Sequence, residues 1–325
     1  SMYKKIKIIT LVNSKGMELQ ILNFGATLVS LKVPDKNNNL VNVVVSLKNL
    51  EDYLRDVHPC LGSSIGRYAG RISNGHFIIA EKEYPIYHEK GVHLHGGKEG
   101  FDRKFWNVEE IAKGENPKVV LSIKSNHLEE GYPGNLQAKV IYQLTENNEV
   151  NITYTATTDA ETPVNLTNHA YYNLDGEGTI FNHNLMVNSS SHLEVSDQLL
   201  PSGRLISSKN TRFDRPKLSK IGRSDFIGYD DTFVLDKKVL KAVLTSPKTG
   251  IKMEVFTNQP ASVIYTPIEL PKLPFKNNVE YSKYAAICFE TQNFPDAPNK
   301  QHFPNSMLKP KEEYLNKSIF KFSLI

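Results

Sequence analysis

Short runs of apolar and β-branched residues recur along the whole chain, and within them apolar positions tend to alternate with polar ones. Alternation with a period of two is typical of β-strands, whose successive side chains point to opposite faces. Clusters of Asn, Gly, Pro and Asp separate the runs, as turns between strands would. The pattern predicts strands over residues 6–12, 18–24, 27–33, 41–47, 119–123, 137–144, 150–157, 253–257, 262–266, 285–291 and 318–324.

Helical periodicity is weak by comparison. Residues 48–55 could form one or two helical turns, and little else in the chain could. No Gly/Ser-rich or Pro-rich linker divides the chain, and it contains no evident internal repeat. Many short strands with frequent turns indicate a sandwich or barrel, and all-β domains reach this length as one unit. The sequence therefore predicts an all-β protein with a single antiparallel domain over residues 1–325 and very little helix.

Charge and cysteine content narrow the classes of function. The 325 residues carry a formal net charge of +4, without the dense basic tract that nucleic-acid binding usually needs. No apolar stretch approaches the roughly 20 residues that span a bilayer, so no membrane partner is expected either. Cys60 and Cys288 are too few for a disulfide framework and are expected to be reduced thiols. A cytoplasmic protein is the resulting expectation.

The run 163–174 is rich in hydrogen-bonding side chains. If it is extended, Asn165, Thr167, His169, Tyr171 and Asn173 share one face. A face of amides, hydroxyls and an imidazole suits a ligand with many hydroxyl groups. The alternative is an outer face exposed to solvent.

A lone carboxylate lies in the apolar run 285–294. Glu290 shares a face with Cys288 and Gln292, opposite Ile287 and Phe289. Partial burial there would raise the pKa of Glu290 above its ordinary value. The alternative is a glutamate that is paired with a cation in the core.

Two further features could serve a site. His93 and His95 would face the same side of a strand, as metal ligands can, although no third imidazole or carboxylate follows them in a recognisable metal motif. The alternative is that one or both are only hydrogen-bonded. Arg67 and Arg71 lie in a glycine-punctuated stretch that suits a loop over a pocket, or they are simply exposed.

Seven segments, in order along nearly the whole chain, resemble the aldose 1-epimerase (galactose mutarotase) family. They are 66–72 (GRYAGRI), 93–97 (HLHGG), 130–134 (EGYPG), 167–174 (TNHAYYNL), 200–203 (LPSG), 228–231 (GYDD) and 289–296 (FETQNFPD). The resemblance implies a large antiparallel β-sandwich with an open sugar-binding cleft. It also implies an isomerase that needs no cofactor or metal and interconverts the α and β anomers of free aldohexoses such as galactose and glucose.

The resemblance also implies roles for individual residues. Glu290 corresponds to the general base, His169 to the general acid and His95 to a second active-site histidine. Arg71 and Asp230 correspond to a pair that binds the sugar.

Three positions depart from the family pattern. Asp231 stands where many members have histidine, Gly70 where some have asparagine, and Val263 where some have glutamine. The preferred aldose is therefore left open by the resemblance.

Three other functions compete with this one. A non-catalytic carbohydrate-binding protein would keep Arg71 and Asp230 without an aligned acid and base. A hexose-phosphate epimerase would need extra cations for a dianion, for which Arg67 and Arg103 are the candidates. A metal-dependent enzyme would use His93 and His95. The expected partner is a monosaccharide substrate, and the expected assembly is a monomer or homodimer.

Overall fold

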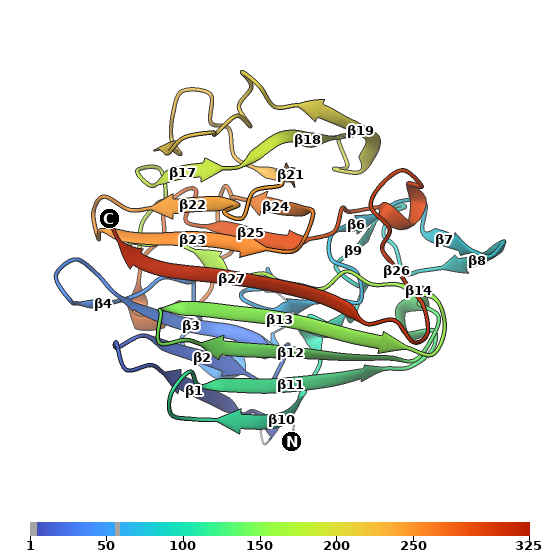
Figure 1. Cartoon of the computed structure of the whole chain (residues 1–325), viewed down its shortest axis with the longest axis horizontal. Helices are drawn as coiled ribbons and strands as arrows, with labels where there is room; N and C mark the ends of the chain where they lie inside the picture. Colours follow the sequence, from blue (N-terminus) through green and yellow to red (C-terminus); the bar gives the residue numbers. More distant parts are fainter. Residues whose placement is uncertain (1–4, 56–58) are drawn as a thin grey trace.

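The computed structural model describes residues 5–55 and 59–325. Strands make up most of its regular structure, and the only helical segments in these ranges are short 3₁₀ turns (Figure 1). The helical turns predicted within 48–55 are confirmed by the 3₁₀ segment at Leu50–Leu54. The 3₁₀ segments are η2 (Leu50–Leu54), η3 (Phe101–Arg103), η4 (Glu129–Gly131), η5 (Lys276–Asn278) and η6 (Ala297–Asn299). None of the helical segments seen in these ranges is long and apolar enough to cross a membrane.

The largest sheet is a nine-stranded antiparallel layer. Its long central strands alternate buried apolar with more exposed polar positions, which gives the sheet one face toward the core and one toward solvent. In spatial order its strands are β10 (Asn107–Ala112), β11 (Lys118–Ser125), β12 (Leu136–Leu144), β13 (Glu149–Thr158), β27 (Tyr314–Leu324), β23 (Ile251–Thr257), β22 (Ala242–Thr245), β17 (Asn184–Val187) and β20 (Ser219–Lys220).

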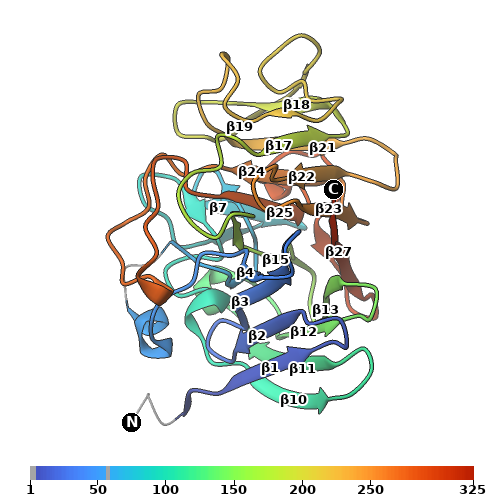
Figure 2. The same cartoon turned by 90° about the vertical axis from the view of Figure 1, so that its left-hand side faces the viewer.

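Two further sheets face this layer, and Figure 2 shows the layers from the side. The six-stranded sheet has the order β16 (Tyr171–Tyr172), β25 (Ile287–Gln292), β24 (Ala261–Tyr265), β21 (Asp230–Leu235), β18 (Ser189–Val195) and β19 (Pro201–Ser207). The four-stranded sheet has the order β1 (Ile8–Val12), β2 (Glu18–Leu22), β3 (Thr27–Pro34) and β4 (Leu40–Asn42).

One large apolar core joins the sheets. Ile287 and Phe289 of β25 point into it, and Tyr172 of β16 stacks on Phe320 of β27 with ring centroids 5.6 Å apart. Removing this apolar surface from water is the main force that holds the layers face to face. The prediction of an all-β antiparallel sandwich with very little helix is confirmed.

Four two-stranded ribbons complete the described strands. They are β5 (Ser64–Ile65) with β15 (Thr167–Asn168), β6 (Arg71–Ile72) with β9 (His93–Leu94), β7 (His76–Ile79) with β8 (Lys82–Pro85), and β14 (Thr162–Pro163) with β26 (Met307–Leu308).

The predicted strand over 41–47 is shorter than expected. β4 ends at Asn42, and the following residues connect two sheets instead of extending one. The N–H of Val43 donates to Leu31 O at 2.9 Å, whereas the N–H of Val45 donates to Tyr171 O at 2.9 Å. The run is apolar because it is buried between the layers, and apolarity alone does not define a continuous strand.

Candidate active site

The floor of the candidate site is built by three neighbouring strands of the six-stranded sheet. Across β25, β24 and β21, Glu290 is paired with Val263 and Val263 with Thr232. One row further along, Tyr265 of β24 is paired with Asp230 of β21. Because directly opposed residues point to the same face of a sheet, this register places the five side chains on one surface.

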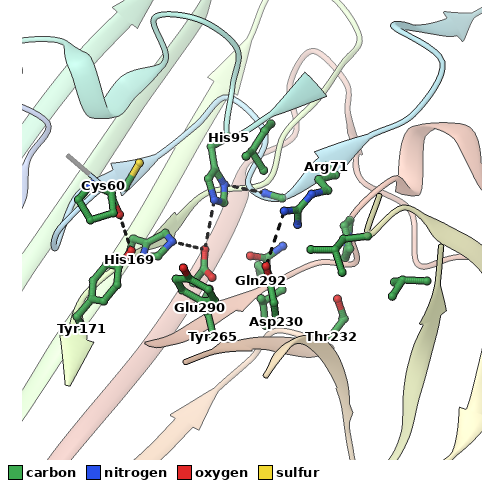
Figure 3. A pocket seen from close by; sticks show the side chains of 17 residues that line it. Cys60, Arg71, His95, His169, Tyr171, Asp230, Thr232, Tyr265, Glu290 and Gln292 are labelled. Carbon is green, nitrogen blue, oxygen red and sulfur yellow. Dashed lines mark hydrogen bonds and ion pairs between the residues drawn. The ribbon is translucent and has the colours of Figure 1, made fainter. Parts of the chain in front are cut away.

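A cavity of about 260 Å³ lies above this surface. Every residue of Glu290's strand β25 is buried, and Ile287 and Phe289 occupy the core side of it. Glu290 and Gln292 must then face the cavity, which they do (Figure 3). The predicted alternation along 285–294 is therefore confirmed. His169, Tyr171, Arg71 and His95 close the cavity from other segments.

Glu290 and two imidazoles meet at one end of the cavity. Glu290 Oε1 lies 3.5 Å from His169 Nε2 and 4.0 Å from His95 Nε2. Only 2% of Glu290 is exposed, and its Oε1 has no hydrogen-bond partner within the part of the chain that the structure describes. Burial, and secondarily the charge of Asp230, raises the pKa of Glu290 to about 8, with the nearby Arg71 acting in the opposite direction. The carboxyl group is thus suited to exchange a proton near neutral pH.

His169 is held by its backbone and by stacking. Its N–H donates to Ser63 O at 2.9 Å, and its carbonyl accepts from the N–H of Gly62 at 3.0 Å. The imidazole stacks on Tyr171 with ring centroids 5.1 Å apart and planes 22° apart. The Tyr171 hydroxyl donates to Pro59 O at 2.6 Å, which fixes that ring in turn. These contacts hold the imidazole in the plane that presents Nε2 to Glu290.

His95 has a tautomer that the backbone defines. The N–H of Gly70 donates to His95 Nδ1 at 3.1 Å, so in the neutral ring the proton must reside on Nε2, toward Glu290. Burial, and then the neighbouring His169 and Arg71, hold the pKa of His95 well below its usual range. His95 is consequently a neutral hydrogen-bond donor to whatever fills the cavity.

Arg71 and Asp230 lie further along the cavity. Arg71 Nη2 is 3.7 Å from Asp230 Oδ2, and both side chains are partly exposed to the cavity. Burial raises the pKa of Asp230, against the opposing charge of Arg71. The pair offers charged donors and acceptors side by side, which suits neighbouring hydroxyl groups of a sugar. All five residues predicted for the site are therefore brought together by the fold.

The expectation that His93 and His95 face the same side is wrong. β9 ends at Leu94, and His95 adopts φ +50°, which breaks the period of two. His93 is buried beside Tyr132, which belongs to a separate apolar cluster. Its Nε2 lies 2.6 Å from the Tyr132 hydroxyl, and its Nδ1 lies 2.6 Å from Tyr87 O. The metal site built on this pair is therefore not formed.

The predicted hydrogen-bonding face of 163–174 is only partly correct. His169 and Tyr171 line the cavity, but Asn165, Thr167 and Asn173 instead satisfy buried backbone carbonyls. The run is not one strand, because β15 and β16 are short pieces in different sheets. Polar residues in the sequence could not distinguish a ligand-binding face from one that caps the backbone.

A second metal hypothesis can be tested on the site itself. His95, His169 and Glu290 offer ligand atoms that lie within 4.8 Å of one another. However, a metal on His95 Nε2 would require the ring proton on Nδ1, where the N–H of Gly70 already donates. The donor set therefore does not fit a metal that uses both imidazoles.

The three positions that depart from the family pattern, and the two arginines considered for a phosphate, do not all reach the cavity. Gly70 and Val263 line the cavity, whereas Asp231 lies outside it and pairs with Arg212 at 3.3 Å. Arg67 is buried, and its guanidinium donates to backbone carbonyls including those of Pro133 and Gly134. Neither it nor Arg103 is among the residues that line the cavity.

Several cavity residues were not predicted from the sequence. Tyr265 and Thr232 reach the cavity because β24 and β21 lie next to β25, and only the strand order reveals this. Val195, Leu199 and Pro295 form an apolar wall from loops and strand ends. The predicted strand 262–266 contains the alternation that places Tyr265 beside Val263, but its neighbours could not be deduced.

Comparison with known proteins gives a consistent result. Residues 7–321 match the family model described as aldose 1-epimerase. The chain is 36% identical over 324 residues to galactose mutarotase of Bos taurus, covering 96% of this chain and 93% of that protein. It is 34% identical over 333 residues to aldose 1-epimerase of Escherichia coli, covering 97% and 95% of the two chains.

Solved structures are similar along the whole fold. An aldose epimerase homologue from C. elegans superposes with a TM-score of 0.91 at 29% identity, covering 98% of this chain and 99% of the other. Galactose 1-epimerase from Lactobacillus acidophilus superposes with a TM-score of 0.87 at 30% identity, covering 98% and 95%.

Proposed function

Because this chain belongs to the aldose 1-epimerase family, we propose that Glu290 and His169 exchange protons with an aldose in the cavity described above. The chain is an isomerase that interconverts the anomers of aldoses. The observation that carries the residue assignment is the approach of a buried carboxylate to an imidazole nitrogen, 3.5 Å away, at the end of a cavity lined by donors and acceptors.

The reaction requires two proton transfers and no redox step. The Glu290 carboxylate takes the proton of the C1 hydroxyl, and protonated His169 gives a proton to the ring oxygen while the bond between C1 and that oxygen breaks. The open aldehyde rotates about C1–C2, and the reverse transfers close the ring on the other face. Each positioned transfer typically contributes about 10²–10⁴-fold. Together they would lower the barrier by about 5–11 kcal/mol.

The remaining polar residues bind and orient the sugar in this proposal. His95, with its proton on Nε2, donates to the oxygen on which charge develops. Arg71 donates to ring hydroxyls and Asp230 accepts from them. Val263 gives an apolar patch beneath the ring, between the acid–base pair and Thr232.

Galactose and glucose are the proposed substrates. The names of the similar mammalian and bacterial proteins support galactose. A hexose phosphate is less favoured, because Arg71 is the only Arg or Lys among the described residues that line the cavity. A purely binding protein would have no need for a buried carboxyl group whose pKa is about 8.

The organisation of the protein is also proposed. The whole chain would act as a single domain, since the large core includes residues from β1 to β27. A monomer or homodimer and a cytoplasmic location are expected, since two cysteines in a chain of 325 residues are too few for the disulfide framework of an oxidising compartment.

Polarimetry on freshly dissolved α-aldoses tests the function. We expect the protein to accelerate the optical rotation change of α-galactose and α-glucose well beyond the spontaneous rate. Rates equal to the spontaneous ones for every aldose tried would contradict the proposal.

A further inference from the structure

Asp296 is a buried carboxylate that follows Glu290 on the same segment but does not line the cavity. Its exposed fraction is 0%. A charge taken out of water is costly unless it is paired and hydrogen-bonded. The partners of Asp296 therefore indicate what this charge does in the fold.

Those partners are Arg71 and Ser73, in and directly after β6, and Lys300, directly after η6. Asp296 Oδ1 accepts from the N–H of Ser73 at 2.8 Å, and Oδ2 accepts from the Ser73 hydroxyl and from Lys300 Nζ, each at 2.8 Å. The backbone N–H of Asp296 donates to Arg71 O at 2.7 Å. The side chain of Asp296 thus holds Ser73, and its backbone holds the carbonyl of Arg71.

The held segment has little support of its own. β6 contains only Arg71 and Ile72, and its one strand partner among the described residues is the equally short β9. An isolated two-stranded ribbon is marginally stable in water. This ribbon carries Arg71 on one strand and leads directly into His95 from the other. Bonds from outside the ribbon fix it relative to β25. The Tyr68 hydroxyl donates to Phe294 O at 2.7 Å just before the ribbon, and Asp296 bonds to Arg71 and Ser73 at β6 itself.

We propose that Asp296 is a positioning residue that anchors β6 to the end of the segment bearing Glu290, so that Arg71 is held over the sugar. This inference rests on the proposed role of Arg71 in sugar binding. Asp296 acts through Ser73 and through the backbone of Arg71 and touches neither the sugar nor the reacting atoms.

Replacement of Asp296 by Asn tests the anchor. The Ser73 hydroxyl reaches both carboxylate oxygens, at 3.0 Å and 2.8 Å, and the N–H of Ser73 reaches one of them. The amide keeps a single acceptor oxygen for these two donors, and its nitrogen cannot accept from Lys300. We expect KM for galactose to rise at least about fivefold, with kcat changed less than about threefold, as expected for loss of a binding contact. A wild-type KM in a folded variant would overturn the proposal.

Lys300→Met is the matched control. It removes the ion pair but leaves the bonds between Asp296 and Ser73, so KM should stay within about twofold of wild type. A rise equal to that of Asp296→Asn would assign the effect to the ion pair and overturn the proposal. If Asp296→Asn does not fold, Ser73→Ala replaces it as the test, because it removes only the hydroxyl bonds to Asp296. Ser73→Ala should raise KM about twofold to threefold. An unchanged KM in this variant would overturn the proposal.

A double variant separates this inference from the proposed function. If Asp296 acts through Arg71, KM of Arg71→Ala combined with Asp296→Asn should equal that of Arg71→Ala alone. Effects that multiply would overturn the positioning role while leaving the function intact. A wild-type KM in Arg71→Ala would instead refute the role of Arg71 and with it this inference.

The pH profile provides a readout that a purely structural role would not move. Arg71 lowers the pKa of Glu290, so a displaced Arg71 should shift the acid limb of kcat/KM to higher pH. Simple removal of the negative charge of Asp296 would shift that limb the other way. A shift to lower pH in Asp296→Asn would therefore contradict the proposal.

Discussion

The buried carboxyl group of Glu290 should make the protein less stable as the pH rises, and Glu290→Gln should remove this dependence. The folded-state pKa of about 8 exceeds the ordinary value of 4.5, because burial penalises the charged form. The folded protein therefore holds this proton more tightly than the unfolded chain does. Its contribution to stability is fully present below pH 4.5 and is lost as the pH rises through about 8.

The magnitude follows from the difference between the two pKa values. A difference of about 3.5 corresponds to about 5 kcal/mol, at about 1.4 kcal/mol for each pKa unit. Roughly 4 kcal/mol of this falls between about pH 5 and about pH 9. Glutamine has a similar shape and no titrating proton. Glu290→Gln should therefore become more stable relative to wild type by about that amount over this interval.

Urea unfolding followed by the fluorescence of the single tryptophan, Trp106, measures the effect, because this side chain is buried in the folded state. Glu115→Gln, at an exposed position, is the control. Its free energy of unfolding should match that of wild type at both ends of the interval, about pH 5 and about pH 9. A stability difference between Glu290→Gln and wild type that does not change with pH would refute the reasoning. So would a difference that grows toward low pH.

Three kinetic predictions concern the same site. The acid limb of kcat/KM should lie near pH 8, where Glu290 ionises. Asp230→Asn should shift this limb to lower pH, because the variant removes a negative charge near Glu290. An acid limb that polarimetry across pH finds at the wild-type position in Asp230→Asn would contradict this. His169→Asn should lower kcat by about 10²–10⁴-fold, since it removes a proton transfer. His95→Asn should lower kcat by only about tenfold, since the amide can still donate a hydrogen bond; the reverse ranking would exchange the two roles.

The alternation of buried and exposed positions made much of the fold predictable from the sequence. It located strands such as β12 and β13 and placed Glu290 on the face opposite Phe289. It could not give the order of the strands within a sheet. Tyr265 and Thr232 were therefore missed as cavity residues, although their own strands show the alternation.

The errors have a different physical origin. His95 departs from the expected face because its left-handed backbone conformation ends β9, and no residue type announces this. Asn165 and Thr167 look like ligand-binding residues but donate to the buried backbone carbonyls of Asn293 and Thr291. Such positions depend on contacts between distant segments, which local periodicity does not encode. The five predicted site residues were assembled from family resemblance, and the fold brings them together.

Polarimetry of α-galactose with Glu290→Gln is the most direct measurement of the central claim, that a buried carboxylate and an imidazole pass protons to and from one sugar. With folding verified by circular dichroism, the account predicts a catalysed rate at least about 10²-fold below that of wild type, because the base is lost while its shape is kept. A catalysed rate within about threefold of wild type would contradict it, since one positioned proton transfer is worth more than that.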